Sequence, residues 1–532
     1  MKYNNSKISI YLPILLAIAI AAGIFIGRML PSDTDIQYHS TIKSRNDKLS
    51  NILNIIEANY VDTVNRGELA ESAIPAILRK LDPHSIYIPA KDLARANEPL
   101  KGNFEGIGIS FNMLTDTILV ISTIPGGPSE KLGLLPGDKI IYVNDSLVAG
   151  RKIADEDVMK MLKGPKGTNV KVKILRTGYR ELIPFEITRD KIPIYSVDVD
   201  YMVNDFTGYI RINSFAVTTY EEFLTGLMEL KSKGMKKLIL DLRGNSGGVM
   251  EAAIRIANEF LKEDQLIVYT LGRTQPRSEA RATGKGLFQE GDLVILIDEF
   301  SASASEILAG AIQDNDRGTI IGRRSFGKGL VQEPVTLPDG SGMRLTIARY
   351  YTPTGRSIQK PYKDGFDKYY DDLNDRMAHG EFEVSDSIHF SDSLKFTTPG
   401  GKIVYGGGGI MPDRFVPVDT TMISPYLAKV RALIYRFALK YTETNREQLK
   451  KYTEADEMEK YLNKQALLDQ FVAFAESNNV KKDPAGLKTS GKIIHTQLKA
   501  YIARNILDNK GFYPIWEEID TTLKYAIDYL EK

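Results

Sequence analysis

The chain has 532 residues, with 43% hydrophobic and 26% charged residues, which is the composition of an ordinary globular protein of about three to four domains. Its formal net charge of +1 provides no basic field for nucleic acid, and it contains no basic stripe with interleaved aromatic residues. Because the sequence contains no cysteine, disulfides, thiolate chemistry and cysteine-based zinc sites are excluded.

The first apolar segment, residues 8–27, carries no charge and is preceded by Lys2 and Lys7. This length is typical of a membrane-spanning helix. A cleaved signal peptide is the alternative, with Ala19-Ile20-Ala21 as the cleavage site, although the apolar run continues beyond it. We favour an uncleaved anchor and linker over residues 1–35. The lysines would stay in the cytoplasm, and the remainder of the chain would lie on the periplasmic side of the inner membrane.

Residues 36–100 show the three- and four-residue spacing of amphipathic helices. The apolar positions are Leu49, Leu53, Ile56, Tyr60, Leu69, Ala73, Ile77 and Leu81. The segment ends in a turn, Asp82-Pro83-His84-Ser85, where the helical pattern stops. We interpret His84 as a turn residue rather than as a catalytic base.

Between residues 101 and 190 the pattern changes to short strands and turns. The segment from Phe104 to Ile109 resembles the carboxylate-binding loop of a PDZ domain. Its backbone N–H groups would form a nest for the terminal carboxylate of a peptide, and the strand that follows would pair with the peptide. The predicted peptide-binding residues are Gly106, Ile107, Gly108 and Ile109. Residues 155–162 would form the helix beside the groove.

Residues 191–420 alternate strand and helix patterns, which indicates parallel strands joined by right-handed crossovers. Strands are expected at 208–213, 237–242 and 294–297. The acidic segment 364–393 is expected to be an exposed insertion. Residues 421–532 become helical again, and their role stays open between packing on the core, dimerisation and binding of a partner.

Two polar residues follow strands in this core. Ser303 stands between the buried strand 294–297 and a helix, and Lys328 lies in a glycine-rich turn after a second strand. A serine hydroxyl needs a base to become a nucleophile, and no histidine lies near this serine in the sequence. A lysine in a dry environment can act as that base once burial lowers its pKa. The N–H groups at the start of the helix could stabilise an oxyanion.

Simpler interpretations of both residues stay open at this point. Ser303 and Glu306 fit a capping box, in which the serine would only cap the helix. The spacing from Gly322 to Gly327 and Lys328 approaches a P-loop. However, Gly329 stands where serine or threonine should bind magnesium, and a strand rather than a helix follows. Lys328 could also be an ordinary surface lysine.

Three motifs are set in order along this core. The first runs from Asp241 to Gly248, the second from Ser301 to Glu306, and the third is Phe326-Gly327-Lys328-Gly329 followed by Gln332. Together with the PDZ-like segment, they resemble the C-terminal processing peptidases, also called tail-specific proteases. Two positions depart from the family pattern: Ser246 replaces the usual proline, and Ser325 replaces a more usual threonine.

The resemblance implies a role for each matching residue. Ser303 would be the nucleophile, Lys328 the general base, and Gln332 the residue that orients the lysine amine. The oxyanion donors would be the Ala304 N–H and the Gly247-Gly248 turn, and Glu306 would support the geometry. Within the first motif, Asp241 and Arg243 could pair to shape the loop or form a purely structural ion pair.

The fold that we expect is a multidomain α/β (α+β) chain with a crotonase-like βαβ protease core and an inserted PDZ domain. An N-terminal helical segment precedes it and a C-terminal helical extension follows. The predicted boundaries are 1–35, 36–100, 101–190, 191–420 and 421–532.

The function implied is an exported serine endopeptidase that cleaves proteins at or near their C-terminal tails, without a metal or organic cofactor. Its partners would be proteins and peptides with free tails, and the membrane through the N-terminal helix. An adaptor protein that acts through the PDZ domain and a homo-oligomer are left open. The alternatives are a non-catalytic PDZ scaffold and an enzyme that acts on thioesters, since the βαβ units also resemble coenzyme A hydratases.

Overall fold

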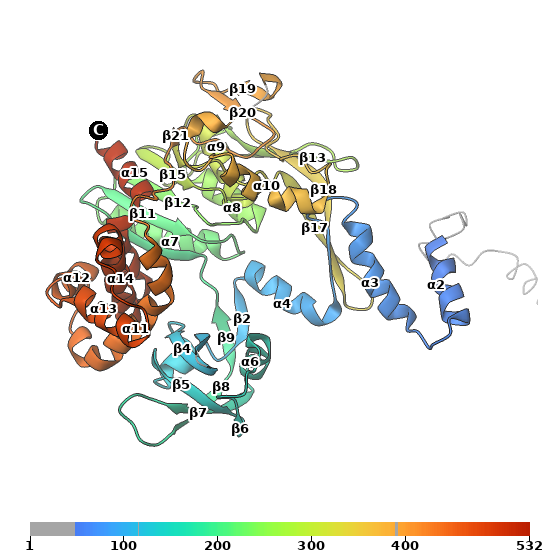
Figure 1. Cartoon of the computed structure of the whole chain (residues 1–532). Coiled ribbons are helices and arrows are strands. Elements are labelled where there is room, and N and C mark those ends of the chain that lie inside the picture. Colours follow the sequence, from blue (N-terminus) through green and yellow to red (C-terminus); the bar gives the residue numbers. More distant parts are fainter. Residues whose placement is uncertain (1–47, 115, 389–391) are drawn as a thin grey trace, which may run out of the picture. The chain divides into compact units, whose positions relative to one another are not determined.

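The computed structural model describes residues 48–114, 116–388 and 392–532 (Figure 1). The chain divides into two units, 1–73 and 74–532, which are described separately. The predicted membrane anchor at residues 8–27 lies outside the described residues. Within the described ranges, every helix is too short or too polar to cross a membrane.

The first unit contains α2 (Lys48–Asn59) and the first part of α3 (Arg66–Leu78). Helices therefore form where the apolar spacing predicts them, and no residue of α2 is buried. In the second unit, the Asp82–Ser85 turn leads into β1 (Ile86–Ile88) and α4 (Ala90–Lys101). Asp82 stabilises the turn by accepting the N–H groups of His84 and Ser85, both at 2.8 Å.

The PDZ-like segment is an antiparallel sheet with two helices. The sheet contains β3 (Ile109–Leu114), β4 (Thr117–Thr123), β5 (Lys139–Val143), β6 (Ser146–Leu147), β7 (Asn169–Leu175) and β8 (Ile183–Thr188). The helices are α5 (Pro128–Lys131) and α6 (Asp155–Leu162). β2 (Asn103–Gly106) pairs with β9 (Asp190–Pro193), so the two ends of the segment return to the core side by side.

The peptidase core is built on a six-stranded sheet in the order β10-β11-β12-β15-β16-β21. The strands are β10 (Val197–Met202), β11 (Thr207–Ile212), β12 (Lys237–Asp241), β15 (Asp292–Ile297), β16 (Thr319–Gly322) and β21 (Arg414–Phe415). All neighbours from β11 onward are parallel, whereas β10 is antiparallel to β11. The helices α7 (Thr219–Ser232), α8 (Met250–Asn258) and α9 (Ala304–Asp314) bury one apolar face of this sheet.

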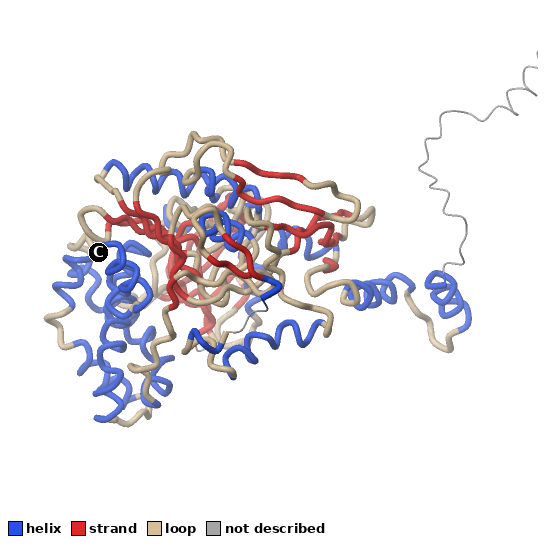
Figure 2. The backbone as a smooth tube through the Cα atoms, turned by 90° about the horizontal axis from the view of Figure 1, so that it is seen from above, coloured by secondary structure: helices blue, strands red, loops and turns tan. Residues whose placement is uncertain are grey.

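A second sheet stands beside the first and is centred on β18 (Gly342–Tyr351). Its other strands are β1, β13 (Leu266–Leu271), β14 (Ser278–Arg281) and β17 (Leu330–Thr336). Two short strands, β19 (Lys395–Thr397) and β20 (Ile403–Tyr405), form a separate hairpin. Figure 2 shows the strands in red and the helices in blue.

The described residues of segment 364–393 are mostly exposed, as predicted, but its helix, α10 (Phe366–Ala378), also buries two side chains. Tyr369 and Arg376 are 2% and 3% exposed. Both lie on one face of the helix, so the acidic residues on the other face dominate the composition. Arg376 donates to the carbonyls of Arg324 and Ser325, which brings α10 against the loop before Lys328.

The C-terminal region contains α11 (Pro425–Leu449), α12 (Ala455–Leu462), α13 (Leu467–Ser477), α14 (Pro484–Trp516) and α15 (Thr521–Glu531). The first four share a core of their own (Figure 1, orange to red). α15 instead buries Leu523, Ala526 and Leu530 against the second face of the six-stranded sheet. Of the three roles that the sequence left open, packing on the peptidase core is therefore observed.

Candidate active site

The predicted site residues meet at the carboxyl ends of two neighbouring parallel strands, where ligands bind in open α/β sheets. The loop after β12 carries Gly247 and Gly248, and the loop after β15 carries Ser303. Ser303, Lys328, Gln332 and both glycines line one cavity of about 750 Å³. Its other walls are mainly apolar: Pro99, Leu100, Phe215, Val217, Val249, Met250, Ile307, Leu330 and Val331.

Ser303 is the residue that precedes α9, with φ 55° and ψ −113°. A positive φ in a non-glycine residue costs on the order of 1–3 kcal/mol and must be maintained by the surroundings. The Ser303 N–H donates to Glu306 Oε2 at 2.8 Å, as in a capping box. The cap interpretation therefore holds for the start of α9, and Ser303 also lines the cavity.

Glu306 connects the serine loop to the lysine loop. Its buried carboxylate accepts the N–H groups of both Ser303 and Lys328 at 2.8 Å on one oxygen. The other oxygen accepts the Ser325 hydroxyl at 2.5 Å and the Gly327 N–H at 2.7 Å. Burial raises the pKa of Glu306 to about 7, and these hydrogen bonds oppose the rise. Four donors on one carboxylate fix the spacing of the two loops.

Tyr350 connects the same two residues through their carbonyl groups. Its hydroxyl, on a fully buried ring, donates to the Lys328 carbonyl at 2.5 Å and to the Ser303 carbonyl at 3.2 Å. No local pattern in the sequence marks this contact. In both Ser303 and Lys328, the N–H therefore donates to Glu306 and the C=O accepts from Tyr350. The Ser303 C=O also accepts the Ile307 N–H within α9.

The Lys328 side chain is largely buried. Burial lowers its pKa, the Glu306 charge opposes this change, and the Arg344 charge adds to it. Lys328 Nζ donates to Gln332 Oε1 at 3.2 Å, so the predicted orienting residue does contact the amine. Among the described residues, no hydrogen bond joins Lys328 Nζ to Ser303 Oγ. The P-loop alternative is wrong, because β17 follows Lys328 where a P-loop requires a helix.

Behind Gln332 lies the Asp82–Ser85 turn. The Gln332 amide nitrogen donates to the His84 carbonyl, which leaves the amide oxygen facing the lysine. The His84 ring bonds the Tyr369 hydroxyl at 2.8 Å and is buried, which lowers its pKa to about 3. His84 is therefore a neutral turn residue, as expected, but its main chain supports the lysine partner.

The two glycines of the predicted oxyanion loop differ in what they can do. The Gly247 N–H donates to Asn245 Oδ1 at 2.8 Å, so it already has an acceptor within the loop, and its role as an oxyanion donor stays a prediction from the sequence. Gly247 instead allows close approach, because an added Cβ would lie 2.7 Å from Ser303 Cβ. In the described part of the chain, the N–H groups of Gly248 and Ala304 donate no hydrogen bond. These two remain the candidate oxyanion donors.

Asn245, which the sequence analysis did not single out, ties the two loops together. Its fully buried side chain donates to the Ile212 carbonyl at 2.9 Å, and its own carbonyl accepts the Ala302 N–H and the Ser305 hydroxyl. The spacing of Gly248 and Ala304 across the cavity therefore depends on this residue.

The predicted peptide-binding loop lies between β2 and β3. Gly106 ends β2, Ile109 begins β3, and Gly108 has φ 74°. The Ile107 carbonyl is held by the Ser129 N–H and hydroxyl. The N–H groups of Ile107 and Gly108 donate no hydrogen bond within the described residues. A loop with two free N–H groups is the nest that a peptide carboxylate requires.

Three segments of the chain match known protein families. Residues 206–366 match peptidase family S41, residues 99–175 match the PDZ domain, and residues 426–508 match a family of unknown function, DUF8443. The carboxy-terminal-processing protease of Bartonella bacilliformis is 36% identical over 319 residues, covering 59% of this chain and 72% of that protein. The carboxy-terminal processing protease CtpB of Bacillus subtilis is 35% identical over 319 residues, covering 59% and 65%.

Among solved structures, the photosystem II D1 C-terminal processing protease is 29% identical, with a TM-score of 0.34, covering 58% of this chain and 89% of its own.

The fold and the matched families define a serine peptidase with a PDZ domain. More narrowly, the chain belongs to the carboxy-terminal processing proteases of family S41. The predicted family and the predicted fold class are confirmed.

Proposed function

We propose that the chain is an exported serine endopeptidase that cleaves proteins at or near their C-terminal tails with a Ser303–Lys328 dyad. The observation that carries this proposal is the double connection between the two residues. Glu306 accepts both of their N–H groups and Tyr350 donates to both of their carbonyls, beside a cavity that both side chains line.

The reaction follows from these positions. Neutral Lys328 takes the proton of the Ser303 hydroxyl as its oxygen attacks the scissile carbonyl carbon. The oxyanion is stabilised by the N–H groups of Ala304 and Gly248. Lys328 then returns the proton to the leaving amine, and the acyl-enzyme forms. Water, deprotonated by the same lysine, releases the acyl group and regenerates the Ser303 hydroxyl.

The lysine amine must move before the first step. In the structure it is bonded to Gln332 and not to the serine, and proton transfer requires hydrogen-bond reach. Catalytic hydrogen bonds often tighten only when substrate is bound. On this proposal, Gln332 holds the amine in the resting enzyme and substrate binding brings it to Ser303 Oγ.

The PDZ domain would supply the preference for tails. The free N–H groups of Ile107 and Gly108 would bind the substrate's terminal carboxylate, and β3 would pair with its last residues. The apolar cavity walls favour apolar side chains near the cleaved bond. Anchoring by residues 8–27, the periplasmic location, an adaptor and a homo-oligomer stay predictions from the sequence.

The test is digestion of an unstructured protein with a free apolar C-terminus by the parent and by Ser303→Ala and Lys328→Ala. Ser246→Ala is the matched control, because Ser246 is an exposed serine of the same cavity. Cleavage that is lost only in the first two variants supports the dyad. Equal cleavage by all four proteins refutes it. No cleavage by the parent, with tail binding retained, favours the scaffold alternative.

An amidated version of the substrate tests capture by the PDZ loop. Removing the terminal negative charge should raise KM and leave kcat nearly unchanged, because the carboxylate contacts only the PDZ loop. Equal KM values for both substrates would contradict capture of the tail through its carboxylate.

A further inference from the structure

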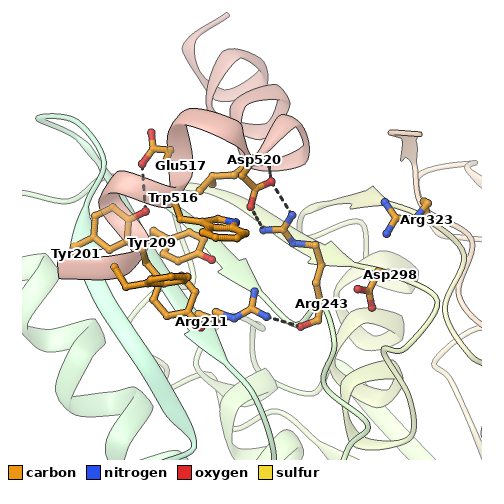
Figure 3. Close-up of a pocket in the computed structure, with 12 residues that line it drawn as sticks. Tyr201, Tyr209, Arg211, Arg243, Asp298, Arg323, Trp516, Glu517 and Asp520 are labelled. Atoms are coloured by element: carbon orange, nitrogen blue, oxygen red, sulfur yellow. Dashed lines mark hydrogen bonds and ion pairs between the residues drawn. The ribbon is translucent and has the colours of Figure 1, made fainter. Parts of the chain in front are cut away.

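The C-terminal region meets the core at the start of the oxyanion loop, residues 243–248. A polar cavity of about 350 Å³ lies at this junction (Figure 3). Trp516, Glu517 and Asp520 line it from the C-terminal region, and Arg211, Arg243 and Asp298 line it from the core.

Arg243 and Asp520 form a bidentate ion pair across this junction. Arg243 Nη1 and Nη2 donate to the two oxygens of Asp520 at 2.8 and 2.7 Å (Figure 3). The side chains are only 14% and 15% exposed, so solvent screens this pair little. A bidentate guanidinium–carboxylate pair also fixes orientation, since both groups are planar.

Asp520 is one of two carboxylates that pair with Arg243. Inside the core, the fully buried Asp241 accepts from both Arg243 and Arg211 and from the Tyr209 hydroxyl. Burial opposes ionisation of Asp241, but the two guanidinium groups hold its pKa well below the usual range. Arg211 has a second carboxylate in the core, since its Nε lies 3.6 Å from Asp198 Oδ2. The second carboxylate on Arg243 is Asp520, which the C-terminal region supplies.

Arg243 is the first residue of the loop that ends in the candidate oxyanion donor. After it, Gly244 N–H donates to Asp298 and Asn245 is bonded to the serine loop. Gly247 then packs on Ser303 Cβ. Within this series of contacts, the C-terminal region contributes the ion pair between Arg243 and Asp520.

We propose that Asp520 is a positioning residue for the reaction at Ser303, and that docking of the C-terminal region sets the geometry of the oxyanion loop. The inference rests on the proposed function for its catalytic part. The C-terminal region, part of which matches a family of unknown function, would then contribute to catalysis and not only to stability.

The test compares Asp520→Asn with Tyr513→Phe in the full-length protein. Asparagine keeps the cap of α15, where Asp520 accepts the Leu523 N–H, but removes the charge that Arg243 binds. Tyr513→Phe removes another hydrogen bond of the same interface, to Asp198 at 2.8 Å, without a bond to the loop. Two measurements are made: kcat and KM on an unstructured substrate, and hydrogen exchange of the amides in residues 243–248.

Losing one oxyanion donor costs about 100- to 1,000-fold in kcat. A loosened loop should cost less, so we expect Asp520→Asn to lower kcat about tenfold at unchanged KM and to speed exchange in 243–248. Tyr513→Phe should do neither. Unchanged exchange in Asp520→Asn overturns the coupling whether or not the protein cleaves, and faster exchange at unchanged kcat overturns its catalytic role. Failure of the parent to cleave, with Ser303→Ala alongside, refutes the proposed function separately.

Discussion

The hydroxyl of Tyr350 offers a direct test of how the two catalytic loops are held. Tyr350→Phe removes a single oxygen and leaves the buried ring, so no cavity forms. The carbonyls of Ser303 and Lys328 then lose a donor at 3.2 and 2.5 Å. A net hydrogen bond contributes about 0.5–1.5 kcal/mol, and an unsatisfied buried group costs about 1–3 kcal/mol. We therefore expect a loss of about 1–3 kcal/mol in the free energy of unfolding.

The effect on activity should exceed the effect on binding. Both carbonyls belong to residues that react with substrate, so a change in their positions should lower kcat by about tenfold and leave KM nearly unchanged. Tyr351→Phe is the matched control, because its ring stacks on Tyr269 and its hydroxyl donates no hydrogen bond in the described residues. Urea denaturation and steady-state kinetics measure the two effects. If the two variants have the same kcat, Tyr350 does not position the dyad.

Three further predictions concern titration. The charge of Glu306 raises the pKa of Lys328, and Glu306→Gln removes that charge. The acidic limb of the kcat/KM–pH profile should therefore move to lower pH in this variant. An unmoved limb would mean that the lysine does not titrate as the base. Gln332→Glu should move this limb upward, because a carboxylate beside the amine favours its charged form, and a downward shift would contradict the contact. Burial raises the pKa of Glu306 from 4.5 to about 7, so its contribution to stability is complete below 4.5 and is lost as the pH rises through 7. Urea denaturation at about pH 5 and about pH 8 should show this loss in the parent and not in Glu306→Gln.

The order of elements in the core could be predicted because each signal is local. The apolar run 294–297 becomes β15, and the Ser303-to-Glu306 spacing marks the start of α9. Lys328 and Gln332 lie four residues apart, so their contact is nearly local as well. A short pattern of apolar and polar residues fixes such features before any tertiary contact forms.

The supporting residues could not be predicted, because their partners are distant in the sequence. Tyr350 lies 47 residues from Ser303, and Gln332 lies 248 residues from His84. Asp520 lies 277 residues from Arg243. Nothing in the neighbourhood of a tyrosine in a strand or an aspartate before a helix indicates which loop it will reach. The Gly247 N–H is a similar case, because only the folded turn shows that it donates to Asn245.

In this site the main chains of the two catalytic loops are held by hydrogen bonds, whereas Lys328 Nζ is bonded to Gln332 and not to Ser303 Oγ. This difference restricts how the proposed enzyme can be activated. Glu306 accepts the N–H groups of Ser303 and Lys328, and Tyr350 donates to their carbonyls, so neither loop can shift without breaking several buried hydrogen bonds. The lysine side chain, by contrast, is held at its tip by one bond of 3.2 Å to Gln332. Exchanging that bond for one to Ser303 Oγ requires rotation about side-chain torsions and exposes no buried backbone group. On the proposed mechanism, activation is therefore a movement of the lysine amine within a preformed site rather than a refolding of the loops that carry it.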